Sequence, residues 1–176
     1  MPLDRFSPAT RAWFTGAFVA PTAAQEGAWE AISSGLDTLV VATTGSGKTL
    51  SAFLWSLDRL ASEPLPERRC RVLYVSPLKA LAVDVERNLR APLTGIRQAA
   101  QRLDLPFPDL RVGTRSGDTP ADERRAFVKN PPDIVITTPE SPFLVPTSAA
   151  RESPPGTPPV LRPRGPYRAA ALVGTK

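Results

Sequence analysis

The stretch Thr38-Leu39-Val40-Val41-Ala42-Thr43-Thr44-Gly45-Ser46-Gly47-Lys48-Thr49 decides the fold. Its apolar beginning predicts a buried strand over 37–41, and the residues after it predict a helix over about 48–61. A strand, a glycine-containing loop that ends in Lys-Thr, and a helix form the context of a phosphate-binding P-loop. The glycines allow a tight turn whose N–H groups point at phosphate oxygens, and the helix N-terminus adds partial positive charge.

Two residues of this loop have predicted contacts with a nucleotide. Lys48 would reach the β- and γ-phosphates, and the Thr49 hydroxyl would ligate Mg²⁺. Ala42 stands where the general pattern G-x-x-x-x-G-K-[ST] has its first glycine. A dinucleotide-binding turn is disfavoured because the third glycine of that fingerprint is missing. A Gly-Ser-Gly turn followed by a surface lysine remains an alternative.

The rest of the chain predicts alternating helices and strands. An aromatic-rich segment over 1–24 predicts a short helix and loops. Further helices are predicted over 22–34, 78–90 and 92–103 and from Thr119 onward, and further strands over 71–76, 110–113 and 133–137. Thr22 and Thr119 are predicted N-caps, and Gly35 follows the end of its helix. Apolar strands that alternate with helices indicate an α/β fold with a parallel sheet.

Composition limits the classes of protein that the chain can belong to. A length of 176 residues suffices for one domain with a core, and no apolar stretch approaches the length of a membrane span. The single cysteine, Cys70, cannot form an internal disulfide, which favours a reducing cytoplasm. The N-terminus lacks the apolar segment of a signal peptide. The absence of histidine excludes histidine catalysis and histidine-ligated zinc.

The C-terminal segment differs from the rest of the chain. Residues 151–176 hold five basic residues against one acidic residue, so most of the net charge of +5 lies there. Six prolines between Pro154 and Pro166 disfavour both helix and strand. We therefore expect residues 1–150 to form the domain and residues 151–176 to be a Pro/Arg-rich tail that is disordered or encoded in a shifted reading frame.

Several motifs in order resemble the large helicase-related (Lhr) family of superfamily 2 DEAD/DEAH-box DNA helicases. Ala42-x-x-Gly45-x-Gly47-Lys48-Thr49 resembles its motif I, and Phe18-x-x-Pro21-Thr22-x-x-Gln25 resembles its Q-motif. Ser76-Pro77-Leu78-Lys79-Ala80-Leu81-Ala82 is similar to motif Ia. Thr137-Thr138-Pro139-Glu140-Ser141 is similar to motif Ib, and Gly117-Asp118-Thr119 to the segment before it.

The resemblance implies a RecA-like domain that binds ATP, Mg²⁺ and DNA, as a single strand or at a duplex/single-strand junction. The implied nucleotide-binding residues are Thr22, Gln25, Thr44, Gly45, Ser46, Gly47, Lys48 and Thr49, with Gln25 on the adenine and Thr49 on the metal. The implied nucleic-acid residues are Pro77, Leu78, Lys79, Thr137, Thr138, Pro139 and Glu140. Arg124, Arg125 and Lys129 are interpreted as a solvated helix face.

One departure from the family pattern limits the predicted activity. The family has an apolar strand ending in Asp-Glu-x-His after motif Ib, whereas this chain has Ser153-Pro154-Pro155-Gly156 in that region. Without these acids Mg²⁺ and the attacking water lack their carboxylate partners. We expect an incomplete, N-terminal RecA-like domain that binds ATP and DNA without hydrolysing ATP or unwinding DNA alone. The alternatives are a non-catalytic nucleotide-binding module, a degraded gene product without activity, and a small P-loop kinase or other NTPase.

Overall fold

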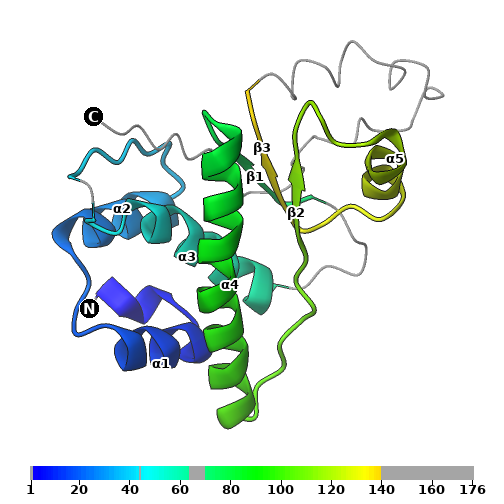
Figure 1. The fold of residues 1–176 in the computed structure, drawn as a ribbon. Coiled ribbons are helices and arrows are strands. Elements are labelled where there is room, and N and C mark those ends of the chain that lie inside the picture. The colour runs from blue at the N-terminus through cyan, green and yellow to red at the C-terminus, as the bar shows by residue number, and fades with distance from the viewer. Residues whose placement is uncertain (1, 44, 64–69, 140–176) are drawn as a thin grey trace. The chain divides into compact units, whose positions relative to one another are not determined.

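The computed structural model describes residues 2–43, 45–63 and 70–139, and these form two compact units (Figure 1). The first unit contains a 3₁₀ helix, η1 (Pro2–Arg5), three helices, α1 (Pro8–Ala17), α2 (Ala23–Ser33) and α3 (Lys48–Ser62), and most of α4 (Lys79–Arg102). The second contains β1 (Val72–Val75), β2 (Val112–Arg115), α5 (Ala121–Lys129), β3 (Ile134–Thr137) and the beginning of α4. The two units are described separately below.

The core of the first unit is an aromatic cluster beneath α2. Trp29 is completely buried, and its ring meets Phe6 and Phe14 edge-on at centroid distances of 4.9 and 5.5 Å. The indole Nε1 of Trp29 donates a hydrogen bond to the backbone oxygen of Ser51 at 3.0 Å, so α2 is fastened to α3. The N-terminal aromatics therefore contribute to this core, although Phe18 remains 43% exposed.

A buried carboxylate joins α1 to α3. Asp58 of α3 is 1% exposed, and its Oδ1 accepts a hydrogen bond from the backbone N–H of Ser7 at 2.9 Å. Ser7 is the N-cap of α1, where its hydroxyl accepts from the N–H of Thr10. The cap and the carboxylate together satisfy N–H groups that a helix N-terminus leaves without partners.

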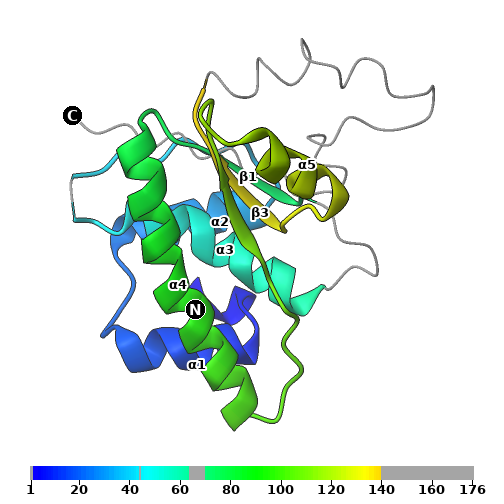
Figure 2. The same cartoon turned by 45° about the vertical axis from the view of Figure 1, so that its right-hand side comes forward.

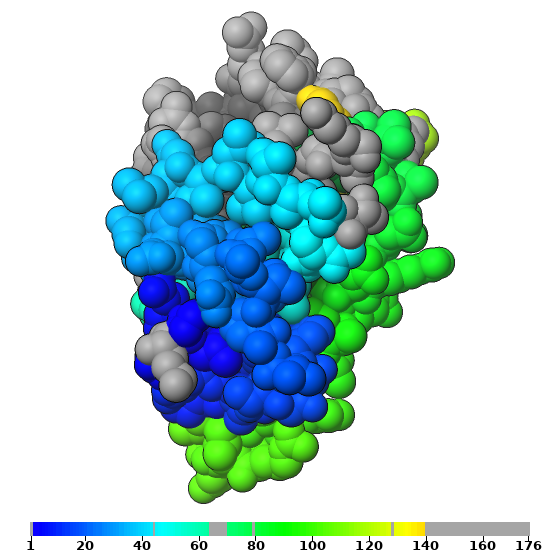
Figure 3. All heavy atoms as spheres, turned by 90° about the vertical axis from the view of Figure 1, so that its left-hand side faces the viewer, coloured from blue at the N-terminus to red at the C-terminus, as the bar shows by residue number. Residues whose placement is uncertain are grey.

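The predicted strand over 37–41 does not form, so that prediction was wrong. These residues have no regular secondary structure, and Leu39 and Val41 are 79% and 84% exposed. Figure 3 shows the stretch between α2 and α3, in light blue, at the surface of this face. A strand exists only when its backbone pairs with another strand, and none of the described strands pairs with 37–41. Apolar sequence alone therefore did not produce a strand here.

The two helices predicted over 78–90 and 92–103 are one helix, α4, which continues through Pro92. Proline removes a single N–H donor, and its ring disfavours the preceding turn. An apolar stripe with helical spacing runs past this position, and its members Leu89, Pro92 and Ile96 are buried. Burial on one continuous face outweighs the local cost of the proline, which the sequence interpretation overestimated.

The second unit is built on a parallel sheet with strand order β1-β3-β2 (Figure 2). The central strand, β3, is buried at each of its four residues. Its register places Thr137 opposite Val75 of β1 and opposite Arg115 of β2. The predicted α/β class with a parallel sheet is confirmed, and the carboxyl ends of the three strands lie at one edge.

Two boundaries differ from the prediction. The strand predicted over 110–113 is β2, Val112–Arg115, two residues later. The N-cap of α5 is Pro120 rather than Thr119, whose Oγ1 instead accepts from the N–H of Ser116 at 2.8 Å. The hydroxyl therefore closes the turn before the helix.

Gly113 is expected to be intolerant of a side chain. A Cβ at this position in β2 would lie 2.7 Å from the Phe127 ring and 2.9 Å from Pro132. Overpacking of this kind typically costs about 1–3 kcal/mol, so Gly113→Ala should lower the free energy of unfolding by that amount in a urea titration. Gly117→Ala is the matched control because no atom lies within 4 Å of its added Cβ. Equal effects of the two substitutions would contradict this packing argument.

Three further predictions concern the single cysteine, membrane spans and the C-terminal tail. Cys70 is free and buried, and burial raises the pKa of its thiol to about 11. Within the described residues, no helix is long and apolar enough to cross a membrane. The predicted tail over 151–176 lies outside the described part of the chain.

Candidate functional site

The P-loop residues stand directly before α3, as predicted. Gly45 and Gly47 have φ values of +83° and +79°, in the left-handed region that favours glycine. Gly47 is the N-cap of α3, and no side chain caps the helix there. Since the first N–H groups of a helix have no acceptor within it, the beginning of α3 offers donors to an anion.

Lys48 is held by the loop itself. Its Nζ donates hydrogen bonds to the backbone oxygens of Ala42 at 2.6 Å and Thr43 at 2.7 Å. The Ser46 N–H and hydroxyl also donate to the Thr43 oxygen. An ammonium group has three donors, so at least one donor of Lys48 can reach a phosphate without breaking these contacts.

The Q-motif residues contact the same loop. Thr22 and Gln25 form a capping box at the start of α2, in which Gln25 Oε1 accepts from the Thr22 N–H at 3.0 Å. Thr22 Oγ1 donates to the backbone oxygen of Ser46 at 3.0 Å. Gln25 is 4% exposed, and a Cβ added to Gly47 would collide with its Nε2. The α2 cap and the P-loop therefore pack against each other, and Gln25 is no surface glutamine.

The residues present fit the polyphosphate of a nucleotide. Two left-handed glycines, an uncapped helix N-terminus and a lysine in its first turn are the donors that such a group needs. Thr49, also in the first turn of α3, is half-buried, and its hydroxyl is of the kind that would ligate Mg²⁺. Within the described residues, no group of three or more His, Cys, Asp or Glu side chains could hold a metal ion. Thr44, another predicted contact, lies outside the described residues.

The two predicted nucleic-acid segments follow neighbouring strands of the second unit. Motif Ia follows β1, motif Ib begins with the last residue of β3, and the Ser76 N–H donates to the Thr137 oxygen at 2.7 Å. Pro77, Leu78 and Pro139 are exposed, and Lys79 is the first residue of α4. Thr137 and Thr138 are 3% and 1% exposed, so their side chains are in the interior. Glu140 is outside the described residues.

Arg115 is a residue at this edge that the sequence interpretation missed. It ends β2, opposite Thr137 in the register. The strand was expected to end at Gly113, which placed Arg115 in a loop. Side chains alternate between the two faces of a strand, so Arg115 could be assigned to a face only once the strand was known to extend to residue 115.

Comparisons with known proteins identify relatives along most of the chain. The family model described as DEAD/DEAH box helicase matches residues 22–149. The chain is 66% identical over 153 residues to the "Lhr helicase/ probable uracil glycosylase" of Mycolicibacterium smegmatis, covering 86% of this chain and 10% of the relative. It is 52% identical over 157 residues to the "Lhr helicase/uracil glycosylase" of Escherichia coli, covering 85% of this chain and 10% of that protein.

A solved structure has the same fold. The structure of Mycobacterium smegmatis helicase Lhr bound to ssDNA and AMP-PNP matches with a TM-score of 0.79 and 67% identity, over 86% of this chain and 19% of the solved chain. The resemblance expected from motifs I, Ia and Ib is thereby confirmed. The chain spans about a tenth of the length of the two curated relatives.

Proposed function

The chain belongs to the DEAD/DEAH box helicase family, and on that basis we propose that it is the ATP-binding and DNA-binding part of the first motor domain of an ATP-dependent DNA helicase. The proposed domain extends over residues 1–150. One observation carries the proposal, namely the packing of Gln25 against Gly47 beside the uncapped N-terminus of α3. That close approach supports the assignment of the Q-motif and motif I to one nucleotide site.

In the proposed site, α3 and Lys48 bind the phosphates, and Thr49 binds Mg²⁺. Because the Oε1 of Gln25 already accepts from Thr22, its Nε2 is the group that would donate to the adenine edge. Bound ATP would supply the energy that a helicase uses to move along a strand. Thr22 positions the loop through its bond to the Ser46 oxygen.

The proposed nucleic-acid surface is the carboxyl edge of the sheet. Ligands of parallel sheets bind beyond the carboxyl ends of the strands, and the segments after β1 and β3 lie there side by side. The exposed Pro77, Leu78 and Pro139 are available for contact. The interior position of Thr137 and Thr138 supports contact through backbone N–H groups of this segment rather than through their hydroxyls. A single strand is the proposed form of the DNA, and a junction is a second proposed form.

We further propose that this chain alone does not turn over ATP. Its sequence has no Asp-Glu box behind an apolar strand after motif Ib. A carboxylate that holds Mg²⁺ and another that orients water are needed for phosphoryl transfer to water. A cytoplasmic location of the protein also remains a prediction.

Replacing Lys48 tests the nucleotide site. Lys48→Ala should weaken Mg·ATP binding about 10- to 100-fold, because a hydrogen bond from a charged donor contributes about 1.5–3 kcal/mol. Calorimetry or fluorescence with a labelled ATP analogue measures this. Lys129→Ala removes the same charge from the exposed end of α5 and should leave affinity unchanged. Binding that survives Lys48→Ala would refute the proposed site.

The hydrolysis proposal has its own measurement. Phosphate release from ATP by the purified chain should remain at background with and without single-stranded DNA. Turnover that DNA stimulates and that Lys48→Ala abolishes would refute the proposal that this chain is inactive alone. Absence of both ATP and DNA binding would instead favour the alternative of a gene product without independent activity.

A further inference from the structure

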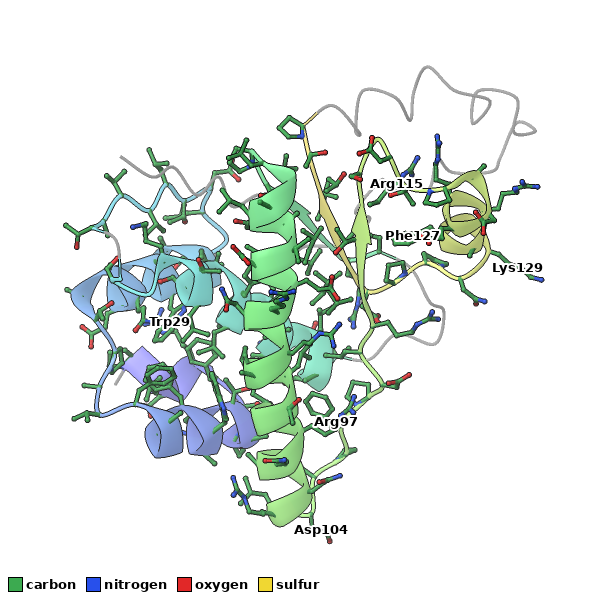
Figure 4. The ribbon with its side chains drawn as sticks, in the orientation of Figure 1. Trp29, Arg97, Asp104, Arg115, Phe127 and Lys129 are labelled. Atoms are coloured by element: carbon green, nitrogen blue, oxygen red, sulfur yellow. The ribbon has the colours of Figure 1, made fainter. Side chains whose placement is uncertain are left out.

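Two arginines are brought together at the carboxyl edge of the sheet. Arg115 ends β2 at the level of Thr137, with which the motif Ib segment begins. Arg124 belongs to α5, which begins shortly after the end of β2. Figure 4 shows Arg115 between the end of β2 and α5. Arg115 lies on the same face of β2 as Gly113, where an added Cβ would meet Phe127 of α5, so Arg115 faces the helix that carries Arg124.

Hydrogen bonds fix the positions of this turn and of Arg124. The Ser116 N–H donates to Thr119 Oγ1 at 2.8 Å, and the Thr119 N–H donates to the Ser116 oxygen at 3.2 Å. The Arg124 Nε then donates to the Thr119 oxygen at 2.8 Å. Because the hydrogen bond of Arg124 within residues 70–139 uses Nε, both terminal nitrogens of its fork can face a ligand.

The arrangement of the two guanidinium groups is electrostatically unfavourable as it stands. Burial, together with the charge of Arg124, lowers the pKa of Arg115. Within residues 70–86 and 110–139, neither arginine forms an ion pair with a carboxylate. Arg115 is half-buried and Arg124 exposed. Two like charges held together by the fold attract an anion, because its charge would relieve their repulsion.

We propose that Arg115 and Arg124 form a phosphate-binding pair that takes one backbone phosphodiester of a single DNA strand beside the end of β2. This inference rests on the proposed function and extends the expected interface, which comprised only the segments after β1 and β3, to the third strand. Two planar forks suit the oxygens of a phosphate, which Lys would contact only as a point charge. Contacts of this kind set the position of a strand and do not read its bases.

The test is the salt dependence of DNA binding by the full chain. A fluorescent oligothymidine of about 12 nucleotides matches the usual site sizes of single-strand binding surfaces. Removing one arginine that neutralises a phosphate should reduce the slope of log K against log salt by about 0.7 and weaken binding about fivefold near 0.1 M salt. Arg115→Gln and Arg124→Gln should each show both effects. Arg115→Lys should keep most of the slope but bind more weakly, because it keeps the charge without the fork.

Arg125→Gln is the matched control. It removes the same charge from the neighbouring position of α5, where the Arg125 Nε donates to the Ala121 oxygen, and it should change neither slope nor affinity appreciably. Circular dichroism checks that the variants keep their fold. If Arg115→Gln unfolds, Arg124→Gln still tests the pair, because Arg124 is exposed. Wild-type slopes in both Arg→Gln variants, or an equal effect of Arg125→Gln, would overturn the pair while leaving DNA binding intact.

Two other outcomes are informative. One distinguishes a DNA phosphate from a free phosphate ion, and the other distinguishes failure of the arginine pair from failure of DNA binding itself. Inorganic phosphate alone should not saturate the wild-type chain at millimolar concentration. Saturable phosphate binding that Arg115→Gln abolishes, with unchanged oligothymidine binding, would overturn the DNA assignment in favour of a free anion. If the wild-type chain binds no oligothymidine at low salt, the proposed DNA-binding function fails, and the pair fails with it.

Discussion

Trp29→Ala should lower the free energy of unfolding by about 3–5 kcal/mol, the usual cost of removing a fully buried large aromatic side chain. The residue is 0% exposed, lies edge-on to Phe6 and Phe14, and hydrogen-bonds to the Ser51 oxygen. Its removal leaves a cavity between the N-terminal aromatics and removes the hydrogen bond that joins α2 to α3. A decrease of this size is a large part of the total stability of a domain. Denaturant titration followed by circular dichroism measures it.

Two further tryptophan variants make the result specific. Trp29→Phe keeps most of the apolar volume but loses the Nε1 donor, so it should cost about 1–2 kcal/mol, in line with one buried hydrogen bond and a shape change. Trp55→Ala is the control, because Trp55 is half-buried and its ring lies 5.7 Å from that of Phe6. If Trp55→Ala were as damaging as Trp29→Ala, the assignment of Trp29 as the centre of this core would be wrong.

Gly47→Ala is expected to disrupt the P-loop far more than Gly45→Ala. Both glycines have positive φ, so an alanine at either position costs about 1–2 kcal/mol of backbone strain. At Gly45 the added Cβ meets nothing within 4 Å, whereas at Gly47 it would collide with Gln25 Nε2. Gln25 cannot turn away freely, because its Oε1 is part of the α2 capping box. An additional cost of about 1–3 kcal/mol follows from the overpacking at Gly47.

A double-mutant cycle distinguishes the collision from the strain. The Gln25→Ala background removes the colliding amide, so Gly47→Ala should then cost about as much in unfolding free energy as Gly45→Ala. Affinity for Mg·ATP provides a second measurement, in which Gly45→Ala should bind about tenfold more weakly, the equivalent of ~1.4 kcal/mol. Gly47→Ala should bind more weakly still. Equal costs of Gly45→Ala and Gly47→Ala in the wild-type background would show that Gln25 does not pack against the loop as described.

Local signals predicted much of the fold. Thr22 formed the predicted N-cap of α2, Gly35 followed the end of that helix with a positive φ, and continuous apolar runs formed β1 and β3. These features depend on neighbours within a few residues, so periodicity and cap chemistry suffice to find them. The weaker strand, β2, was displaced by two residues because its boundary depends on pairing with β3 rather than on composition.

The candidate sites were predicted to different degrees. Motif spacing identified Gly45, Gly47 and Lys48 and the two segments that follow β1 and β3, and the structure brings those two segments together at one edge. It also buries Thr137 and Thr138, which the motif had suggested as contacts, and it adds Arg115. Exposure and register are properties of packing across the sheet. No spacing rule within one segment could therefore supply them.

By itself, the sequence determined the α/β class, the P-loop with its glycine turn, the Thr22 N-cap and the family, because these depend on local chemistry and on the order of motifs. Tertiary structure alone decided that 37–41 does not pair with the described strands, that α4 continues through Pro92, that Gln25 packs against Gly47, and that Arg115 ends β2 opposite Thr137. Each of these features depends on which residues, distant in the sequence, lie next to the segment in the folded chain. The free energy of such contacts comes from pairing and burial between segments, and local propensity carries no information about either.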